Sequence, residues 1–219
     1  MTNSVQIDYY SDVLCVWAWI AERRLSEVEK EWGEKVTIRH HFMDIFSDSH
    51  TKIPQQWADR NSWSGFAQHV RESAAPYEHA EVNARIWQSV RPSTSANAHL
   101  LLKAAQLELG ENPAQQLAWA FREAFFMHAQ DIGRLDVLQS ICDDSNVDYQ
   151  SLQQHLNTGT AMAALLSDHK LSQQQGLKGS PSWVMNNDRQ TLYGNVGYRI
   201  ISANIEEVLR TPYTEASWC

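Results

Sequence analysis

Hydrophobic and polar positions alternate at the start of the chain, as in a strand with one buried face, at Val5, Ile7 and Tyr9. Ser11 and Asp12 can supply a turn and an N-cap, and apolar residues then recur at helical spacing as far as Gly33. Alternation returns over 36–42, which predicts a second strand that is parallel to the first through a right-handed crossover. The first part of the chain therefore predicts one βαβ unit.

The pattern changes in the middle of the chain, where residues 53–176 show almost no strand periodicity. Amphipathic helical stretches are clearest over 98–109 and over 117–128, and Gly133 marks a break between helices. We therefore expect residues 53–176 to form an all-α insertion subdomain.

Strand patterns return after residue 179. They cover 182–185 and 190–193, and a last helix carries one apolar stripe at Tyr198, Ile201, Ile205 and Val208. The order is βαβ, helical insertion, ββα, so the fold class is α/β. We expect a domain made of 1–52 and 177–212, the insertion 53–176, and a C-terminal tail 213–219.

Charge and cysteine usage restrict the partners and the compartment. The 26 acidic and 18 basic residues give a net charge of -8 without a basic cluster, so nucleic acid is not expected as a partner. The longest apolar run, residues 13–21, is too short to span a membrane, and no Lys or Arg precedes Arg23 as in a secretory signal. Three widely spaced cysteines, Cys15, Cys142 and Cys219, fit a reducing compartment, so we expect a cytoplasmic protein.

Cys15 is the main candidate for chemistry because it lies where the first strand gives way to the first helix. A helix N-terminus stabilises a thiolate, which predicts a pKa for Cys15 below the usual cysteine value. The alternative is that Cys15 is a small buried hydrophobic residue. A second feature is Pro181, which opens a strand after a turn containing glycine.

Together these segments resemble the DsbA-like thioredoxin-fold family, especially its cytoplasmic branch, which is similar to kappa-class glutathione transferases and 2-hydroxychromene-2-carboxylate isomerases. The resemblance rests on residues 7–13 leading into Cys15, on 21–25, 98–101 and 179–183, and on Tyr193 with Gly194. It implies a thioredoxin fold with a large all-α insertion.

The resemblance also implies an active site. It predicts that the Ser180–Pro181 bond is cis and lies near Cys15, and that the Ser180 backbone contacts glutathione or a substrate. It places Asn195 where relatives bind the γ-glutamyl end of glutathione, although an N-cap role would explain Asn195 equally well. It places His99 on an insertion helix that faces the active site, where a hydrogen-bonded structural role is the alternative.

The chain departs from the family motif at Ala18. Disulfide-exchanging members have Cys-x-x-Cys, whereas Ala18 occupies the position of the resolving thiol, so attack at Cys15 leaves a mixed disulfide without a neighbouring thiol. External glutathione could resolve it, Cys219 could fold back, or Cys15 could activate a bound thiol without exchange. We favour glutathione, expect Cys219 to lie in an inactive tail, and expect Cys142 to be packed in the core.

Tryptophan and histidine are the remaining conspicuous residues. Trp17 and Trp19 flank the motif and could wall a hydrophobic substrate site, and four others could line a groove or fill the insertion core: Trp57, Trp63, Trp87 and Trp119. The nine histidines include no metal-binding pair, and His40 and His41 should point to opposite faces of a strand, so no metal is expected.

The leading hypothesis is a glutathione-dependent thiol oxidoreductase that acts on small thiols or disulfides through Cys15 alone. A glutathione-dependent isomerase or transferase is the alternative enzyme class, and a non-catalytic binding module is the third. Relatives are often dimers, so the exposed edge strand or a tryptophan-rich helix could form a homodimer interface.

Overall fold

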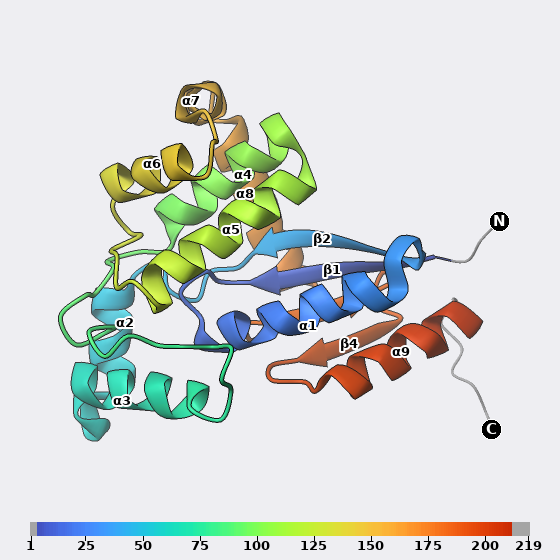
Figure 1. The fold of residues 1–219 in the computed structure, drawn as a ribbon, viewed down its shortest axis with the longest axis horizontal. Coiled ribbons are helices and arrows are strands. Elements are labelled where there is room, and N and C mark those ends of the chain that lie inside the picture. Colours follow the sequence, from blue (N-terminus) through green and yellow to red (C-terminus); the bar gives the residue numbers. More distant parts are fainter. Residues whose placement is uncertain (1–3, 212–219) are drawn as a thin grey trace.

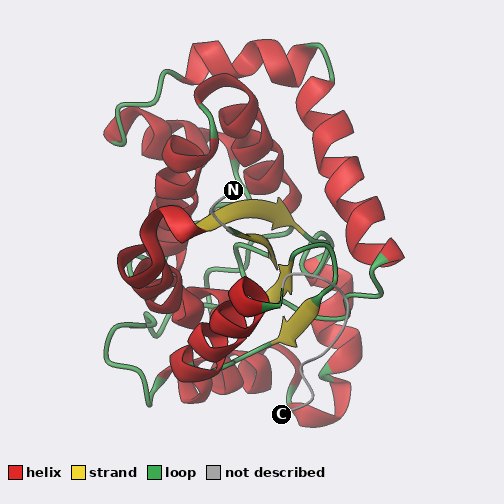
Figure 2. Cartoon of the chain, turned by 90° about the vertical axis from the view of Figure 1, so that its right-hand side faces the viewer, coloured by secondary structure: helices red, strands yellow, loops and turns green. Residues whose placement is uncertain are grey.

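A four-stranded mixed sheet forms the centre of the computed structural model, which describes residues 4–211, and helices lie on both sides of the sheet (Figure 1, Figure 2). The strands are β1 (Val5–Ser11), β2 (Val36–Phe42), β3 (Ser182–Met185) and β4 (Gln190–Tyr193). Their order is β2-β1-β3-β4, with β1 parallel to β2 and antiparallel to β3, and β3 antiparallel to β4. The first and last parts of the chain thus meet in one sheet, as the sequence pattern predicts.

The described residues also form nine α-helices. They are α1 (Val16–Trp32), α2 (Ser49–Gln56), α3 (Ser62–Ala74), α4 (Ala96–Leu109), α5 (Glu111–Phe126), α6 (Leu135–Asp144), α7 (Tyr149–Asn157), α8 (Thr160–Gln174) and α9 (Tyr198–Arg210). Of these, α1, α5, α8 and α9 contact the strands. Short 3-10 helices occur at Gly33–Lys35 and Ala58–Arg60. The expected α/β thioredoxin fold with a helical insertion is therefore confirmed.

One helix crosses a predicted domain boundary. Helix α2 begins at Ser49 and runs through the boundary predicted between residues 52 and 53, so the helical layer starts earlier than the sequence pattern indicates. The tail 213–219, with Cys219, lies outside the described residues. The division into two subdomains stays a prediction.

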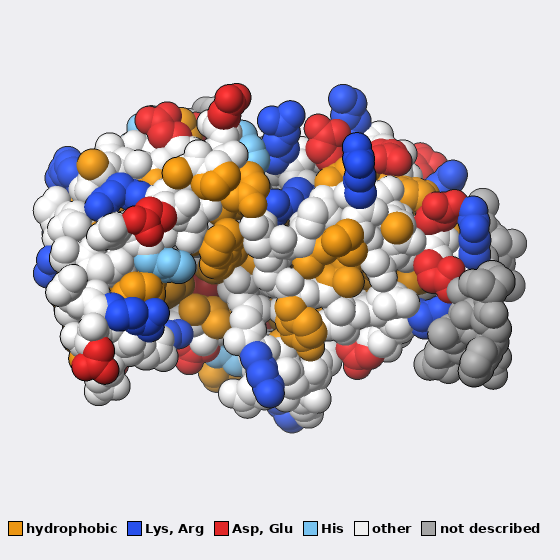
Figure 3. Space-filling model, turned by 90° about the horizontal axis from the view of Figure 1, so that it is seen from below, with side chains coloured by type: hydrophobic (Ala, Val, Ile, Leu, Met, Phe, Trp, Pro, Cys, Tyr) orange, Lys and Arg blue, Asp and Glu red, His pale blue; other side chains and the backbone are white. Residues whose placement is uncertain are grey.

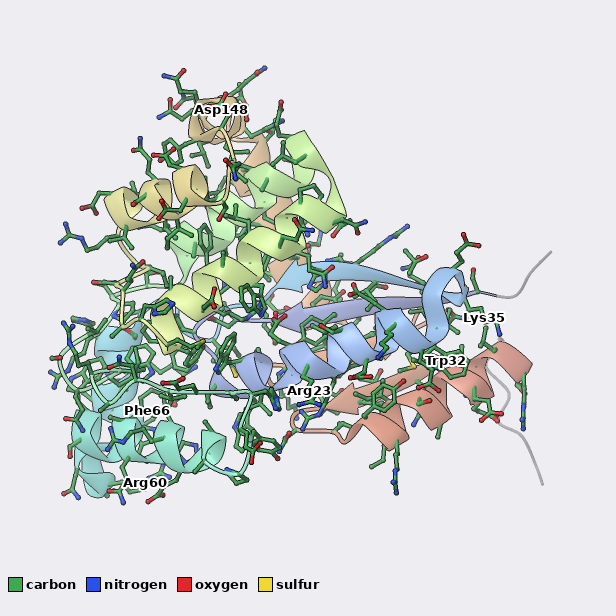
Figure 4. All side chains as sticks on the ribbon, in the orientation of Figure 1. Arg23, Trp32, Lys35, Arg60, Phe66 and Asp148 are labelled. Carbon is green, nitrogen blue, oxygen red and sulfur yellow. The ribbon has the colours of Figure 1, made fainter. Side chains whose placement is uncertain are left out.

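One face of the sheet packs against α1 and α9. Its core is a cluster of buried side chains from these elements: Val5, Ile7, Tyr9, Ala21, Leu25, Val28, Trp183, Met185, Ile201, Ile205 and Val208. Trp32, at the end of α1 next to α9, packs against this cluster (Figure 4). Each fully buried aliphatic or aromatic side chain of this kind contributes about 1.5–3 kcal/mol, so this cluster fixes α1, and with it the residue that precedes α1, against the sheet.

A second core lies within the helical insertion, where Trp87 is completely buried among four other aromatic rings. Its ring centroid lies 5.6 Å from Phe46, 5.4 Å from Phe66, 6.0 Å from Trp63 and 5.3 Å from Phe125. We call these five residues the aromatic cluster. They join α3 and α5 to the loop that follows β2.

A charged network lies on the face of the sheet opposite α1. His41 Nδ1 lies 2.8 Å from Asp168 Oδ1 and His41 Nε2 lies 3.0 Å from Asp8 Oδ1, while Lys103 Nζ lies 3.0 Å from Asp168 Oδ2. Burial alone would lower the pKa of His41, but the two carboxylates outweigh it and raise that pKa to about 9. His41 is therefore an imidazolium at neutral pH, and the network ties α4 and α8 to the sheet.

We expect His41→Leu to lower the free energy of unfolding by about 3 kcal/mol at neutral pH, because it leaves two carboxylates partly buried without their shared partner. The pKa of His41 is raised by folding, so this contribution is present at neutral pH and is lost as pH rises through about 9. Urea unfolding across this pH range measures the difference between wild type and variant. The exposed His128→Leu is the control, and a difference that does not change with pH would contradict the assignment.

Candidate active site

Cys15 is the N-cap residue of α1, in the loop that leads from the end of β1 into the helix. Its backbone carbonyl accepts hydrogen bonds from the Ala18 N–H at 3.1 Å and from the Trp19 N–H at 3.0 Å. The Cys15 side chain is only 7% exposed, and Ala18 is fully buried. The thiol thus lies at the strand-to-helix junction that the sequence pattern predicts.

The segment before β3 brings Ser180 and Pro181 to this thiol. Cys15 Sγ donates to the Ser180 carbonyl at 3.2 Å across 165 positions of sequence, and Ser180 Oγ accepts from the Asp12 N–H at 2.9 Å. The Ser180–Pro181 peptide bond is cis, and Pro181 is buried. Two loops from opposite ends of the chain therefore meet at Cys15.

Asp12 has a larger role than the turn and N-cap that its position suggests, since Cys15 is the N-cap. The Asp12 side chain is fully buried and accepts four hydrogen bonds. Its donors are Leu14 N at 2.9 Å, Ile45 N at 3.2 Å, Phe46 N at 2.9 Å and Ser95 Oγ at 2.8 Å. One carboxylate thus joins the Cys15 loop, the loop after β2 and the start of α4.

His99 supports the same loop from behind. Its Nε2 accepts from the Val13 N–H at 3.1 Å, and its ring stacks on Phe42 with centroids 5.1 Å apart. Burial lowers the pKa of His99 to about 4, so the imidazole is neutral at physiological pH and can act as this acceptor. His99 is 1% exposed and lies outside the cavity lining, so its geometry fits the structural role rather than ligand contact.

A cavity of about 370 Å³ opens beside the thiol, a volume suited to a small organic ligand. Hydrophobic lining residues include half-buried Trp17 and, from the aromatic cluster, Phe46 and Phe66. Phe66 is labelled on α3 in Figure 4. The remaining lining residues are Leu14, Cys15, Val16, Ile45, Lys52, Gln56, His69, Val70, Lys178, Gly179 and Ser180.

Positive charge dominates this cavity. Lys52 and Lys178 line it, and its lining contains no carboxylate. His69 also lines it, but burial lowers the pKa of His69, so this imidazole is neutral at neutral pH and adds no charge. The Lys52 Nζ donates to the Ile45 carbonyl and lies 5.3 Å from the centroid of the Phe46 ring. Because a cluster of this kind attracts anions in a partly enclosed site, the cavity favours a ligand with carboxylates.

Asn195 does not take the position that the sequence indicates. Gly197, not Asn195, is the N-cap of α9, so the N-cap role is wrong. The Asn195 Nδ2 instead donates to Tyr77 Oη at 2.6 Å, in the segment that follows α3. Asn195 lies outside the cavity lining, and a role in glutathione binding stays a prediction.

The other tryptophans are also displaced from the thiol. Trp19 is buried, donates from Nε1 to the Glu81 carbonyl at 3.1 Å, and stacks on Phe126. The tryptophans of the insertion, Trp57, Trp63, Trp87 and Trp119, are absent from the cavity lining. They do not form a groove over Cys15, and Trp87 in particular fills the core.

The expectation of a lowered pKa for the Cys15 thiol is wrong. Burial is the largest influence and raises this pKa, and it outweighs the hydrogen bonding of the Ser180 side chain and of the first-turn amides of Ala18 and Trp17, which favours the thiolate. The helix N-terminus is visible in the sequence, whereas the desolvation of a side chain covered by the Ser180 loop depends on the packed fold. The free protein therefore holds Cys15 mainly as a thiol at neutral pH.

We expect the rate of Cys15 alkylation by iodoacetamide to increase steadily with pH and to continue increasing beyond the range of an ordinary cysteine, because only the thiolate reacts. Stopped-time labelling followed by intact mass measures this profile. The double variant Cys142→Ser, Cys219→Ser leaves Cys15 as the one cysteine of the sequence, so the profile reports on Cys15 alone. A plateau near neutral pH would contradict the raised pKa.

The remaining cysteine and histidine positions give no second reactive centre among the described residues. Cys142 is fully buried on α6, as predicted, and burial raises its pKa to about 12. No group of three or more His, Cys, Asp or Glu side chains in residues 4–211 is arranged to hold a metal ion.

No described helix is long and apolar enough to cross a membrane. On the face drawn in Figure 3, Lys and Arg side chains are scattered among Asp and Glu.

Sequence reasoning missed the two lysines of the cavity and the role of Asp12. Lys178 lies two positions before Ser180, so this short separation in sequence could have placed Lys178 near the site. Lys52 reaches the cavity only through the packing of α2, which no sequence pattern reveals. A charged residue between the buried strand and the apolar run 13–21 was the signal for Asp12.

Known proteins resemble this chain in sequence over nearly its whole length. The family described as DSBA-like thioredoxin domain matches residues 6–206. The ClpXP adapter protein SpxH of Bacillus cereus is 22% identical over 215 residues, which cover 95% of this chain and 70% of that protein.

Solved structures share the fold at low sequence identity. A Nitrosomonas europaea protein, provisionally assigned as a protein disulfide isomerase, aligns with a TM-score of 0.79 at 13% identity over 94% of this chain and 98% of its own. The cytosolic disulfide reductase DsbM of Pseudomonas aeruginosa, solved with GSH, gives 0.64 at 15% over 94% and 99%. A 2-hydroxychromene-2-carboxylate isomerase gives 0.63 at 13% over 94% and 97%.

Proposed function

The chain belongs to the family of DSBA-like thioredoxin domains, and from this premise we propose that it is a thiol-disulfide oxidoreductase that uses Cys15 as a single nucleophile and glutathione as cosubstrate. The observation that carries the proposal is the contact of Cys15 Sγ with the Ser180 carbonyl at 3.2 Å, at the mouth of a cavity that holds two lysines. A cytoplasmic location, where reduced glutathione is abundant, fits this proposal.

The exchange proceeds in two balanced steps. The Cys15 thiolate attacks the glutathione sulfur of a mixed disulfide, a new sulfur–sulfur bond forms, and the substrate leaves as a thiolate that takes up a proton. A glutathione thiolate then attacks the glutathione sulfur bound to Cys15, which releases glutathione disulfide and regenerates Cys15. External glutathione is needed because the fully buried Ala18 occupies the resolving position.

Charge and backbone geometry support glutathione as the cosubstrate. Glutathione carries carboxylates, which Lys52 and Lys178 can pair with at the cavity rim. The Ser180 N–H has no hydrogen-bond partner among the described residues, so it is available to an extended peptide.

An isomerase or transferase is the second candidate enzyme. The missing second thiol at Ala18 favours it, as does the fold shared with a 2-hydroxychromene-2-carboxylate isomerase. Cys15 would then hold glutathione without forming a disulfide with it.

A non-catalytic adapter is the remaining candidate. Burial that raises the pKa of Cys15 favours this function, because such a thiol is less reactive, and the curated relative from Bacillus cereus is an adapter protein. Its test is shared with the enzyme candidates.

Exposure to glutathione disulfide followed by intact mass separates the three candidates. In a Cys219→Ser background, which removes the third cysteine of the sequence, we expect one glutathione unit on the otherwise unchanged chain and on Cys142→Ser, none on Cys15→Ser, and release of the adduct by added glutathione. Saturable glutathione binding without an adduct would favour the isomerase or transferase. If glutathione forms no adduct and does not bind, the result would favour the adapter function.

A further inference from the structure

Strand β2 is an edge of the sheet, since only β1 pairs with it. An edge strand has alternate residues whose N–H and C=O groups point away from the sheet, and proteins usually cover these groups. In β2 the Met43 N–H, just beyond the strand, bonds to the Ser11 carbonyl of β1, so the residues one position away, such as Phe42, point outward.

Side chains from the insertion cover this edge at two of its outward residues. The Phe42 N–H donates to Asp168 Oδ2 at 3.0 Å. The His40 N–H donates to Glu111 Oε2 at 3.4 Å, and the His40 carbonyl accepts from Gln106 Nε2 at 2.8 Å. The half of β2 next to the insertion is thus protected residue by residue.

The next outward residue, Ile38, has no such cover. Its N–H and C=O have no hydrogen-bond partner among the described residues, whereas the N–H of Val36, two positions earlier, donates to the Gly33 carbonyl. Ile38 is half-buried on the wall of a groove of about 740 Å³ between β2, α1 and α5. These three elements lie beside one another in Figure 1. We call this space the edge groove.

The edge groove is acidic with one aromatic side chain. Three carboxylates line it, and one of them, Glu22, pairs with Arg122 at 2.7 Å. The other two, Glu29 and Glu111, form no ion pair with a basic side chain in the described part of the chain. Its lining contains no Lys or Arg, and Trp119 contributes a ring that is 43% exposed. An open strand edge therefore faces uncompensated negative charge and an exposed aromatic surface.

We propose that the edge groove binds an extended segment of a partner protein, rich in lysine or arginine, by strand addition at Ile38. The segment donates to the Ile38 carbonyl and accepts from the Ile38 N–H. Its basic side chains lie next to Glu29 and Glu111, and an alkyl stem packs on Trp119. Because one residue of the edge is open, the backbone adds only the two hydrogen bonds at Ile38, and charge selects the partner.

A second copy of this chain fits the edge groove poorly. Pairing the same edge of two copies would place Glu29 and Glu111 near their own counterparts, in a protein whose net charge is already -8. The groove shares no lining residue with the cavity beside Cys15. The proposed binding is therefore tested separately from the proposed exchange reaction.

Fluorescence anisotropy with the full chain tests the proposal, using a fluorescein-labelled peptide of alternating lysine and valine. We expect saturable binding that weakens with salt. The variant Ile38→Pro removes the outward N–H at an edge position that tolerates proline, and we expect about tenfold weaker binding. Ile38→Val and Cys15→Ser keep that N–H and should bind as wild type does.

Two altered peptides keep the test independent of how the variants fold. On wild type, a peptide with glutamate in place of lysine should not bind, and a peptide with N-methylated backbone amides should bind about tenfold more weakly. Equal binding of either altered peptide, or no binding of the lysine peptide, would overturn the proposal. Self-association that Ile38→Pro abolishes in sedimentation velocity would also overturn it, in favour of a second copy.

Discussion

Cys15→Ser is expected to lower the turnover of a glutathione mixed disulfide by about a thousandfold or more, because a serine hydroxyl cannot form the sulfur–sulfur bond of the intermediate. The expected loss is in kcat, since Lys52, Lys178 and Ser180 would still line the cavity. A coupled assay that follows glutathione disulfide formation with glutathione reductase measures it. The same assay on wild type should show rates that rise with pH, because burial raises the pKa of the thiol.

Cys142→Ser is the matched control for this loss. Cys142 is fully buried on α6 and lies outside the cavity lining, so this variant should retain full turnover. A Cys15→Ser variant that keeps turnover would contradict the role of Cys15. Loss of turnover in both variants would point to damaged folding, which far-ultraviolet circular dichroism would reveal.

Asp12→Ala is expected to lower the free energy of unfolding by about 3–5 kcal/mol, the largest stability effect of a single change near the site. The change leaves the N–H groups of Ile45 and Phe46 and the hydroxyl of Ser95 buried without an acceptor. It also frees the Leu14 N–H next to Cys15. Urea unfolding followed by circular dichroism measures the loss.

Two control variants distinguish the bonded carboxylate from acidic charge in general. Asp12→Asn keeps one acceptor oxygen, so we expect it to lose less stability than Asp12→Ala. Asp59→Ala removes an exposed carboxylate and should change the free energy of unfolding by less than about 0.5 kcal/mol. Equal losses in Asp12→Ala and Asp59→Ala would contradict the role of Asp12.

Periodicity was sufficient to predict the fold because each strand buries one face and each helix one stripe. The pattern over 182–185 and 190–193 matches β3 and β4 in the structure. The antiparallel pairing of β3 with β4 follows from the short turn that joins these two strands. The start of α2 at Ser49 was missed because apolar spacing becomes clear only from Ile53.

The chemistry of the site was less predictable because it depends on distances through space. Proximity of Cys15 and Ser180 could be inferred from a family resemblance, whereas the desolvation that raises the Cys15 pKa requires the packed loop. Asn195 precedes a helix in the sequence, yet the chain turns for two more residues before Gly197 caps α9. Lys52 enters the cavity through packing alone.

The aromatic cluster has an optical consequence. Phe46 and Phe66 form part of the cavity wall and also touch Trp87, which is completely shielded from solvent. Light emitted by Trp87 should therefore lie at the blue end of the tryptophan range and shift when a ligand displaces either phenylalanine. The cavity is thus reported by two tryptophans, Trp87 one ring away and Trp17 in the lining itself, and the Trp17→Phe variant separates the signal of Trp87 from that of Trp17.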